Sequence, residues 1–310
     1  MDEQNRSMNI QDEQNRSMNT QDEQRTKQSY GLAVCNFMNG RLHILFVKKK
    51  YTYSFFEFVF GKYPKFDKVR LEELFNGMTF QEKSLILEMN FDKLWCKIVL
   101  NVPEDPNSIS RNRIKLKRPT GKKRFELAFT DGLSGFIHEE EKTSELTAKE
   151  KEYATYTNKK QRFEELTDDG GKLLKELIGH STSSDPIWEI PKGRPDDNEK
   201  SLDTAMREFT EETNSMANYY KIIHEIEPIK INYVNGNCLY NNEYYVAIAR
   251  GNWNPSELFQ TYENNREVEE VRWINTDEIR FLNRGQHTYL LMIDLMNKIR
   301  NSIKQYRPKN

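Results

Sequence analysis

The sequence predicts an α/β protein whose sheet-forming parts are separated by a long, mainly helical insertion. Segments with the apolar patterns of strands lie on both sides of this interval. Within the interval, apolar residues recur every three or four positions, which is typical of helices. The first residues form polar repeats that bury too little apolar surface to fold. The chain is therefore expected to contain a tail, a split α/β domain and an insertion.

The tail is predicted at 1–27 and is expected to be disordered. Its run at 2–9 returns at 12–19, and a third partial copy begins at Asp22. The entropy lost on ordering such polar repeats is not offset by burial. We assign these repeats no function.

The first part of the α/β domain is predicted at 28–63. Strands at 31–37 and 42–47 are expected to form a hairpin, because Asn39-Gly40 between them is a dipeptide typical of tight turns. The basic run Lys48-Lys49-Lys50 follows, and then a run rich in phenylalanine.

The insertion is predicted at 64–180. Thr79 and Glu82 have the spacing of a capping box, which marks the start of a helix. A charged stretch at 139–160 is expected to be flexible. From the spacing of their apolar residues, helices are expected at 67–75, 79–89, 91–99 and 162–178.

The second part of the α/β domain is predicted at 181–310. Asn235-Gly236 is expected to join two strands as a second hairpin. The expected strands lie at 226–234, 242–250 and 271–274. Helices are expected at 201–213 and at 288–303, where Leu291, Leu295, Ile299 and Ile303 are spaced by a helical turn.

The segment 201–213 carries candidate metal ligands. A helix there places Glu208, Glu211 and Glu212 on one face within one turn. Like charges this close destabilise a helix by about 0.2–0.5 kcal/mol per pair, so their clustering favours a bound cation. Carboxylate oxygens suit Mg²⁺ or Mn²⁺ better than zinc. Taken alone, however, Glu211-Glu212 would indicate only a solvated helix face.

The residues around these glutamates form an ordered series: Ile190-Pro191-Lys192-Gly193, then Glu199, then Arg207-Glu208 and Glu211-Glu212. This series resembles the signature of the Nudix hydrolases, here at 193–215. Asn214 stands where the family usually has glycine, and Ser215 where it has an apolar residue. The first change is benign, because Asn is the next best residue for the left-handed conformation just past a helix end.

The resemblance implies a Nudix α/β/α sandwich that hydrolyses a phosphoanhydride with Mg²⁺ or Mn²⁺. It implies that Glu208, Glu211 and Glu212 hold the metal and that Arg207 orients them. Gly193 would let the loop backbone approach the helix closely. Lys192 would lie with Gly193 at the substrate phosphates, and Glu199 would be a structural or outer group.

Further pairs of motifs resemble the mRNA-decapping Nudix enzymes of large cytoplasmic DNA viruses. They are Phe56-Glu57-Phe58 with Gly61-Lys62-Tyr63, Met78-Thr79 with Glu82-Lys83, and Phe91-Asp92 with Leu94-Trp95. This resemblance implies a viral enzyme of the host cytoplasm that releases m7GDP and 5′-monophosphate RNA from capped RNA. A downstream catalytic carboxylate is then expected at Glu267, with Glu269 and Glu270 as alternatives.

A dense basic segment at 111–124 is the candidate for RNA binding. Clustered positive charge attracts phosphate backbones largely without sequence preference. The alternative is a solvated loop. The candidate residues are Arg111, Arg113, Lys115, Lys117, Arg118, Lys122, Lys123 and Arg124.

Two other functions fit the same residues. One is a pyrophosphatase acting on diphosphoinositol polyphosphates or nucleotides, and the other is a non-catalytic Nudix-like RNA-binding module. Trp188, Trp253 and Tyr262 are candidates for stacking on a cap base, and the sequence does not select among them.

Composition indicates a soluble intracellular protein. The formal net charge of −1 does not by itself indicate a nucleic-acid partner. No window approaches the roughly 20 apolar residues that span a bilayer, and no signal peptide precedes the domain. Cys35, Cys96 and Cys238 are widely spaced, so they predict reduced thiols rather than disulfides or a zinc site.

Overall fold

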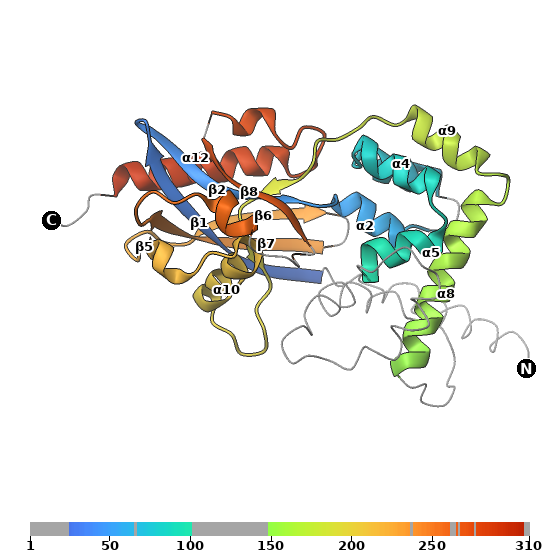
Figure 1. Cartoon of the computed structure of the whole chain (residues 1–310), viewed down its shortest axis with the longest axis horizontal. Coiled ribbons are helices and arrows are strands. Elements are labelled where there is room, and N and C mark those ends of the chain that lie inside the picture. The colour runs from blue at the N-terminus through green and yellow to red at the C-terminus, as the bar shows by residue number, and fades with distance from the viewer. Residues whose placement is uncertain are drawn as a thin grey trace, which may run out of the picture.

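The computed structural model describes residues 25–64, 67–100, 148–235, 238–260, 265, 267–275 and 277–306. Most of the predicted tail and the whole basic segment 111–124 lie outside these residues. Arg25 to Lys27, which we assigned to the tail, already belong to the first strand. Figure 1 shows a sheet between two helices at one end of the molecule and a cluster of helices at the other.

The described residues contain one sheet of eight strands. Its path runs β3-β2-β1-β7-β5, while β4 pairs with β1, β6 with β7 and β8 with β2. β1 and β7 are parallel, and the other pairs are antiparallel. The strands are β1 (Arg25–Met38), β2 (Arg41–Lys49), β3 (Trp188–Glu189), β4 (Lys192–Gly193), β5 (Tyr220–Ile222), β6 (Ile229–Asn235), β7 (Cys238–Ala249) and β8 (Val268–Asn275).

Both predicted hairpins are confirmed. Asn39 and Gly40 join β1 to β2 with φ of 53° and 72°, the left-handed conformation that a two-residue hairpin turn with this dipeptide requires. β6 and β7 pair antiparallel from Asn235, opposite Cys238. The predicted strand at 271–274 lies within β8, which pairs with β2.

Alternation along the strands gives the sheet two buried faces. Ile44 and Phe46 of β2 pack with α12 (Tyr289–Gln305), which was expected at 288–303. Leu45 and Val47 point to the other face, where they pack with α10 (Ser201–Thr213). Figure 1 shows the two helices on opposite sides of the sheet, so the α/β/α sandwich is confirmed.

The inserted helices bury an aromatic core of their own, which includes Phe55, Phe58, Phe75 and Phe163. The Thr79 capping box is present, with the Glu82 side chain bound to the Thr79 backbone. The cluster starts at Tyr53, ahead of the expected boundary at residue 64. Its helices are α2 (Tyr53–Val59), α3 (Lys68–Asn76), α4 (Phe80–Glu88), α5 (Phe91–Leu94), η1 (Trp95–Leu100), α8 (Ala148–Thr167) and α9 (Lys172–His180).

The helix expected at 162–178 was wrong in its bounds. The chain forms two helices there, because Gly170 and Gly171 adopt φ of 74° and 72°, which a right-handed helix cannot contain. The stretch at 139–160 that we expected to be flexible is helical from Ala148 onward. Phe163 and Leu166 anchor this charged helix to the aromatic core.

Three short helices complete the described chain: η2 (Ala217–Tyr219), α11 (Pro255–Gln260) and η3 (Ile279–Phe281). Cys35, Cys96 and Cys238 carry free thiols, and the first two are buried. Within the described ranges, no helix combines the length and the apolar character needed to span a membrane.

Candidate active site

Helix α10 carries the glutamates that we predicted as metal ligands. Ala205 and Phe209 bury their side chains against the sheet, and this packing fixes the rotation of the helix. Asn214 ends the helix with φ of 57°, the left-handed conformation expected of it, and its amide donates to the Leu258 carbonyl at 2.9 Å. The buried Ser215 backbone amide donates to the Thr213 hydroxyl.

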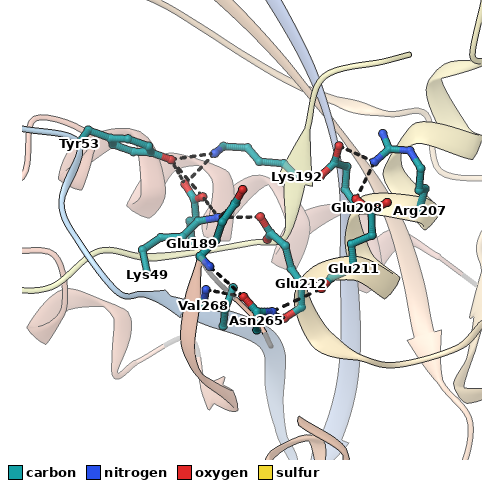
Figure 2. Close-up of polar contacts among 11 residues, drawn as sticks. Lys49, Tyr53, Glu189, Lys192, Arg207, Glu208, Glu211, Glu212, Asn265 and Val268 are labelled. Atoms are coloured by element: carbon teal, nitrogen blue, oxygen red, sulfur yellow. Dashed lines mark hydrogen bonds and ion pairs between the residues drawn. The ribbon is translucent and has the colours of Figure 1, made fainter. Parts of the chain in front are cut away.

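Arg207 gathers three carboxylates. Its Nε and Nη2 donate to the two oxygens of Glu199 at 2.8 and 3.1 Å. Its Nη1 donates to Glu208 at 2.6 Å and to Glu211 at 2.9 Å, as Figure 2 shows. The fork of Arg207 is therefore fixed on one side by Glu199 and orients Glu208 and Glu211 on the other.

Gly193 lies directly against Glu208. A Cβ atom built on Gly193 would be 2.1 Å from Cδ of Glu208 and 2.3 Å from Oε1. A side chain would fit there only if the Glu208 carboxylate moved aside, so the glycine lets the β4 backbone approach α10 while Glu208 keeps its position. The pairing of Gly193 with Tyr30 of β1 holds the loop in this position.

Glu212 points to a second cluster, centred on Lys49 at the end of β2. The Lys49 ammonium lies 2.6 Å from Oε1 of Glu212, 3.3 Å from Glu189 and 3.5 Å from Glu267. Oε2 of Glu212 is buried and has no hydrogen-bond partner among the described residues. The cluster thus contains a carboxylate oxygen with no compensating donor.

Glu189 is a buried glutamate whose carboxylate contacts Lys49, Lys192 and Tyr53. It accepts from Lys192 at 2.7 Å and from the Tyr53 hydroxyl at 2.9 and 3.1 Å. Tyr53 belongs to α2 of the helical cluster, so Glu189 connects that cluster to the sandwich (Figure 2). The Lys192 ammonium also contacts the Tyr53 hydroxyl at 3.4 Å, and its predicted contact with a substrate phosphate stays a prediction.

The candidates for the downstream carboxylate occupy different positions. Glu267 reaches Lys49, and Asn265 caps its backbone by accepting from the Glu267 amide at 3.0 Å. Glu269 pairs with Lys48 at 3.0 Å and is 53% exposed. Glu270 pairs with Lys48 through the sheet backbone. Glu267 is therefore the candidate whose carboxylate joins the cluster around Glu212.

The pKa values of the two buried carboxylates, Glu189 and Glu212, are shifted in opposite directions. Burial raises the pKa of Glu212 to about 8, a rise that Lys49 opposes and that Glu189 and Glu267 increase. Burial also acts to raise the pKa of Glu189, but Lys192 and Lys49 lower it to about 2. Burial would lower the pKa of Lys49, yet the three carboxylates raise it well above its usual range. Positive charge therefore compensates Glu189 better than Glu212.

The donor set fits a divalent cation. The described site brings six carboxylates, from Glu189, Glu199, Glu208, Glu211, Glu212 and Glu267, together with three cations, from Lys49, Lys192 and Arg207. The excess negative charge and the unpartnered oxygen of Glu212 suit a hard cation.

No metal geometry is formed by these side chains. In the described residues, no group of three or more His, Cys, Asp or Glu side chains is arranged to hold one ion. Glu208 and Glu211 turn to Arg207, while Glu212 turns to Lys49. The metal role of these three glutamates stays a prediction.

Sequence reasoning missed Lys49, Glu189 and Tyr53. Alternation would have found the first, because Leu45 and Val47 face α10 and Lys49 is the next residue of that series. Glu189 and Tyr53 had no comparable signal, since 136 positions separate them and only the fold brings them together.

Two of the three candidate stacking aromatics are engaged elsewhere. Trp188 is 5% exposed, and the Arg272 guanidinium lies over its ring, with Cζ of Arg272 4.5 Å from the ring centre. Trp253 packs between Tyr219 and Trp273. Tyr262 and all eight candidate RNA-binding residues of 111–124 lie outside the described residues.

Residues 166–293 match the family model of the NUDIX domain. This range includes β3, β4 and α10, together with Glu267.

The likeness to viral proteins extends well beyond this domain. The chain is 28% identical over 289 residues to the mRNA-decapping protein g5R of African swine fever virus (isolate Warthog/Namibia/Wart80/1980), covering 90% of this chain and 97% of that protein. It is 27% identical over 269 residues to a putative mRNA-decapping protein of Acanthamoeba polyphaga mimivirus, covering 82% of this chain and 63% of that protein. Among solved structures, a C. elegans Ap4A hydrolase complex aligns with a TM-score of 0.37 and 11% identity, over 90% of this chain and 98% of that one.

Proposed function

Because this chain belongs to the Nudix hydrolases, we propose that it is an mRNA-decapping enzyme. It hydrolyses the triphosphate bridge of the 5′ cap and releases m7GDP and RNA with a 5′-monophosphate. The observation that carries the proposal is the extent of the likeness to the viral decapping proteins. That likeness covers 90% of the chain, so it includes inserted helices that the NUDIX match at 166–293 does not reach.

Nudix hydrolases generally use divalent metal ions, and we propose Mg²⁺ or Mn²⁺ here. Glu208, Glu211 and Glu212 would hold the ion through hard carboxylate oxygens. When bound, such an ion neutralises charge on the phosphate bridge and eases deprotonation of the attacking water.

Arg207 orients two of these glutamates in the proposed enzyme. Its contacts to both oxygens of Glu199 fix the guanidinium, and the opposite edge then holds Glu208 and Glu211. Preorganised charges cost no rearrangement during the reaction, which is why fixed side chains of this kind contribute to catalysis.

The remaining predicted groups act on the water and the phosphates. Glu267 is partly exposed beside the Glu212 cluster, so its carboxylate is placed to accept a proton from water. A lysine ammonium has three donors. Lys192 directs donors to Glu189 and Tyr53, and a third donor serves a substrate phosphate next to Gly193.

The proposed substrate is a polymer, which requires a surface for the RNA body. The basic residues at 111–124 remain our candidates for it, because clustered cations bind phosphate backbones. The proposed place of action is the host cytoplasm, where viral relatives of this kind would meet capped messages.

The test compares kcat/KM for capped RNA with that for diphosphoinositol polyphosphates and nucleotides, with Mg²⁺ or Mn²⁺ present. The proposal expects capped RNA to be the preferred substrate and uncapped RNA of the same sequence to compete with it. Preference for a small phosphoanhydride, unaffected by added RNA, would instead indicate a small-molecule pyrophosphatase.

A further inference from the structure

Lys49 is an almost fully enclosed lysine that contacts carboxylates from three separate parts of the chain. Glu212 comes from α10, Glu189 from β3, and Glu267 directly precedes β8. Only 10% of the Lys49 side chain is exposed. A lysine so enclosed is rarely found unless its charge is paired. Here the pairing partners include the carboxylates that we assign to the reaction.

The strand itself aims Lys49 into the site. Leu45 and Val47 point toward α10, and the two-residue period of a strand sends Lys49 the same way. A bulge lies between Lys48 and Lys49, because Lys48 pairs with Glu270 while Lys49 pairs with Val268. Lys48 points to the other face and pairs with the exposed Glu269. Neighbouring lysines therefore have opposite surroundings, which gives a matched control.

Lys49 determines which oxygen of Glu212 is available. Its ammonium takes Oε1 at 2.6 Å, whereas Oε2 is buried without a hydrogen-bond donor. The contact at Oε1 favours this orientation of the carboxylate. The second oxygen is left for a cation.

Lys49 is in turn held in place from the helical cluster. Glu189 contacts the ammonium at 3.3 Å and is itself bound by Lys192 and by the Tyr53 hydroxyl. Tyr53 opens α2, so packing of the aromatic core of the insertion sets the position of its hydroxyl. The chain of contacts runs from Tyr53 through Glu189 and Lys49 to Glu212 (Figure 2).

We propose that Lys49 is a positioning residue that holds Glu212 with one oxygen presented to a divalent cation, and that Tyr53 and Glu189 anchor it from the helical cluster. For its effect on turnover, this inference rests on the proposed function. For its effect on cation binding, it rests on the contacts of Lys49 and on the proposed role of Glu212 as a metal ligand.

The test uses the full-length protein and three variants, Lys49→Met, Lys48→Met and Tyr53→Phe. Mn²⁺ binding without RNA is followed by electron paramagnetic resonance, and folding by thermal unfolding. Groups that orient metal ligands typically change metal affinity by about 10–100-fold when removed, so Lys49→Met is expected to weaken Mn²⁺ binding by about tenfold or more. Lys48→Met is expected to bind Mn²⁺ as the wild type does.

If Lys49→Met does not fold, Mn²⁺ binding by Tyr53→Phe tests the inference instead. It removes one hydroxyl from a side chain that is 38% exposed, so the fold is expected to survive. A smaller loss of Mn²⁺ affinity in the same direction supports the anchoring. Unchanged or tighter Mn²⁺ binding in folded Lys49→Met, or unchanged binding in Tyr53→Phe, would overturn the inference.

Measuring turnover of capped RNA together with Mn²⁺ binding distinguishes failure of this inference from failure of the proposed function. With capped RNA, Lys49→Met is expected to lower kcat and leave KM nearly unchanged, because the proposed role of Lys49 is to orient Glu212 and not to bind RNA. If the wild type binds Mn²⁺ but does not decap RNA, the proposed function fails while the Mn²⁺ comparison still decides the role of Lys49.

Discussion

Substitution of Gly193 by alanine tests the contact between the β4 loop and α10. The added Cβ would lie 2.1 Å from Cδ of Glu208 and 2.3 and 2.4 Å from its oxygens, where ordinary contact begins near 3.4 Å. The carboxylate must therefore withdraw by about 1 Å or more. A displacement of about 1 Å at a reacting centre can lower the rate by about 100-fold. We expect a loss of that order in kcat.

The expected effect on stability is much smaller. Glu208 is a flexible side chain that can move aside, so the free energy of unfolding should change by less than the ~1–3 kcal/mol typical of overpacked cores. Gly179→Ala is the control, because nothing lies within 4 Å of its added Cβ. That control lies in α9 and should keep full activity, with a gain in stability of up to about 1 kcal/mol.

The assay is a steady-state measurement of kcat and KM on capped RNA, combined with thermal unfolding of both variants. A folded Gly193→Ala protein with kcat within about twofold of the wild type would refute the geometric argument. So would an equal loss of activity in Gly179→Ala, since that residue is remote from the site.

Three further predictions concern charge in the same site. Arg207→Lys should lower kcat by about tenfold or more, because a lysine cannot bind Glu199 through two donors while orienting Glu208. A variant with wild-type kcat would contradict this role of Arg207. Burial raises the pKa of Glu212, so a proton competes with Mn²⁺ for this carboxylate. Apparent Mn²⁺ affinity should therefore rise with pH, by up to about tenfold per pH unit, until the carboxylate is fully ionised, and a flat titration series would argue against this competition. Glu267→Gln should reduce kcat strongly while Glu269→Gln should not, and equal effects in a rate comparison would remove the assignment to Glu267.

Local signals in the sequence were sufficient for most of the sandwich. The Asn39-Gly40 dipeptide specifies its hairpin through backbone chemistry that depends on few neighbours, and the pairing of β6 with β7 was predicted from the strands on either side of their connection. The same holds for Asn214, whose left-handed conformation follows from the end of α10. Helix α12 was predictable because its apolar period is long and regular.

Packing rather than local preference decides some of the features that were missed, whereas the break at Gly170-Gly171 is a local signal that was overlooked. The charged helix α8 has few apolar residues to mark it, and it is held by contacts such as Phe163 with the aromatic core. The cluster of Lys49, Glu189 and Tyr53 depends on three elements meeting at one place, which no spacing along the chain encodes. Within the run Lys48-Lys49-Lys50, the sequence does not distinguish Lys49 until it is known which face of the sheet each side chain points to.

The most direct measurement of the central claim is product analysis with cap-labelled RNA, Mg²⁺ or Mn²⁺, and purified wild-type and Glu212→Gln proteins. We expect the wild type to release labelled m7GDP and the variant, which keeps the shape of the side chain without its charge, to release none. Equal release of m7GDP by both proteins would contradict the role of α10. If the wild type released no m7GDP but still cleaved diphosphoinositol or nucleotide substrates, decapping itself would be contradicted.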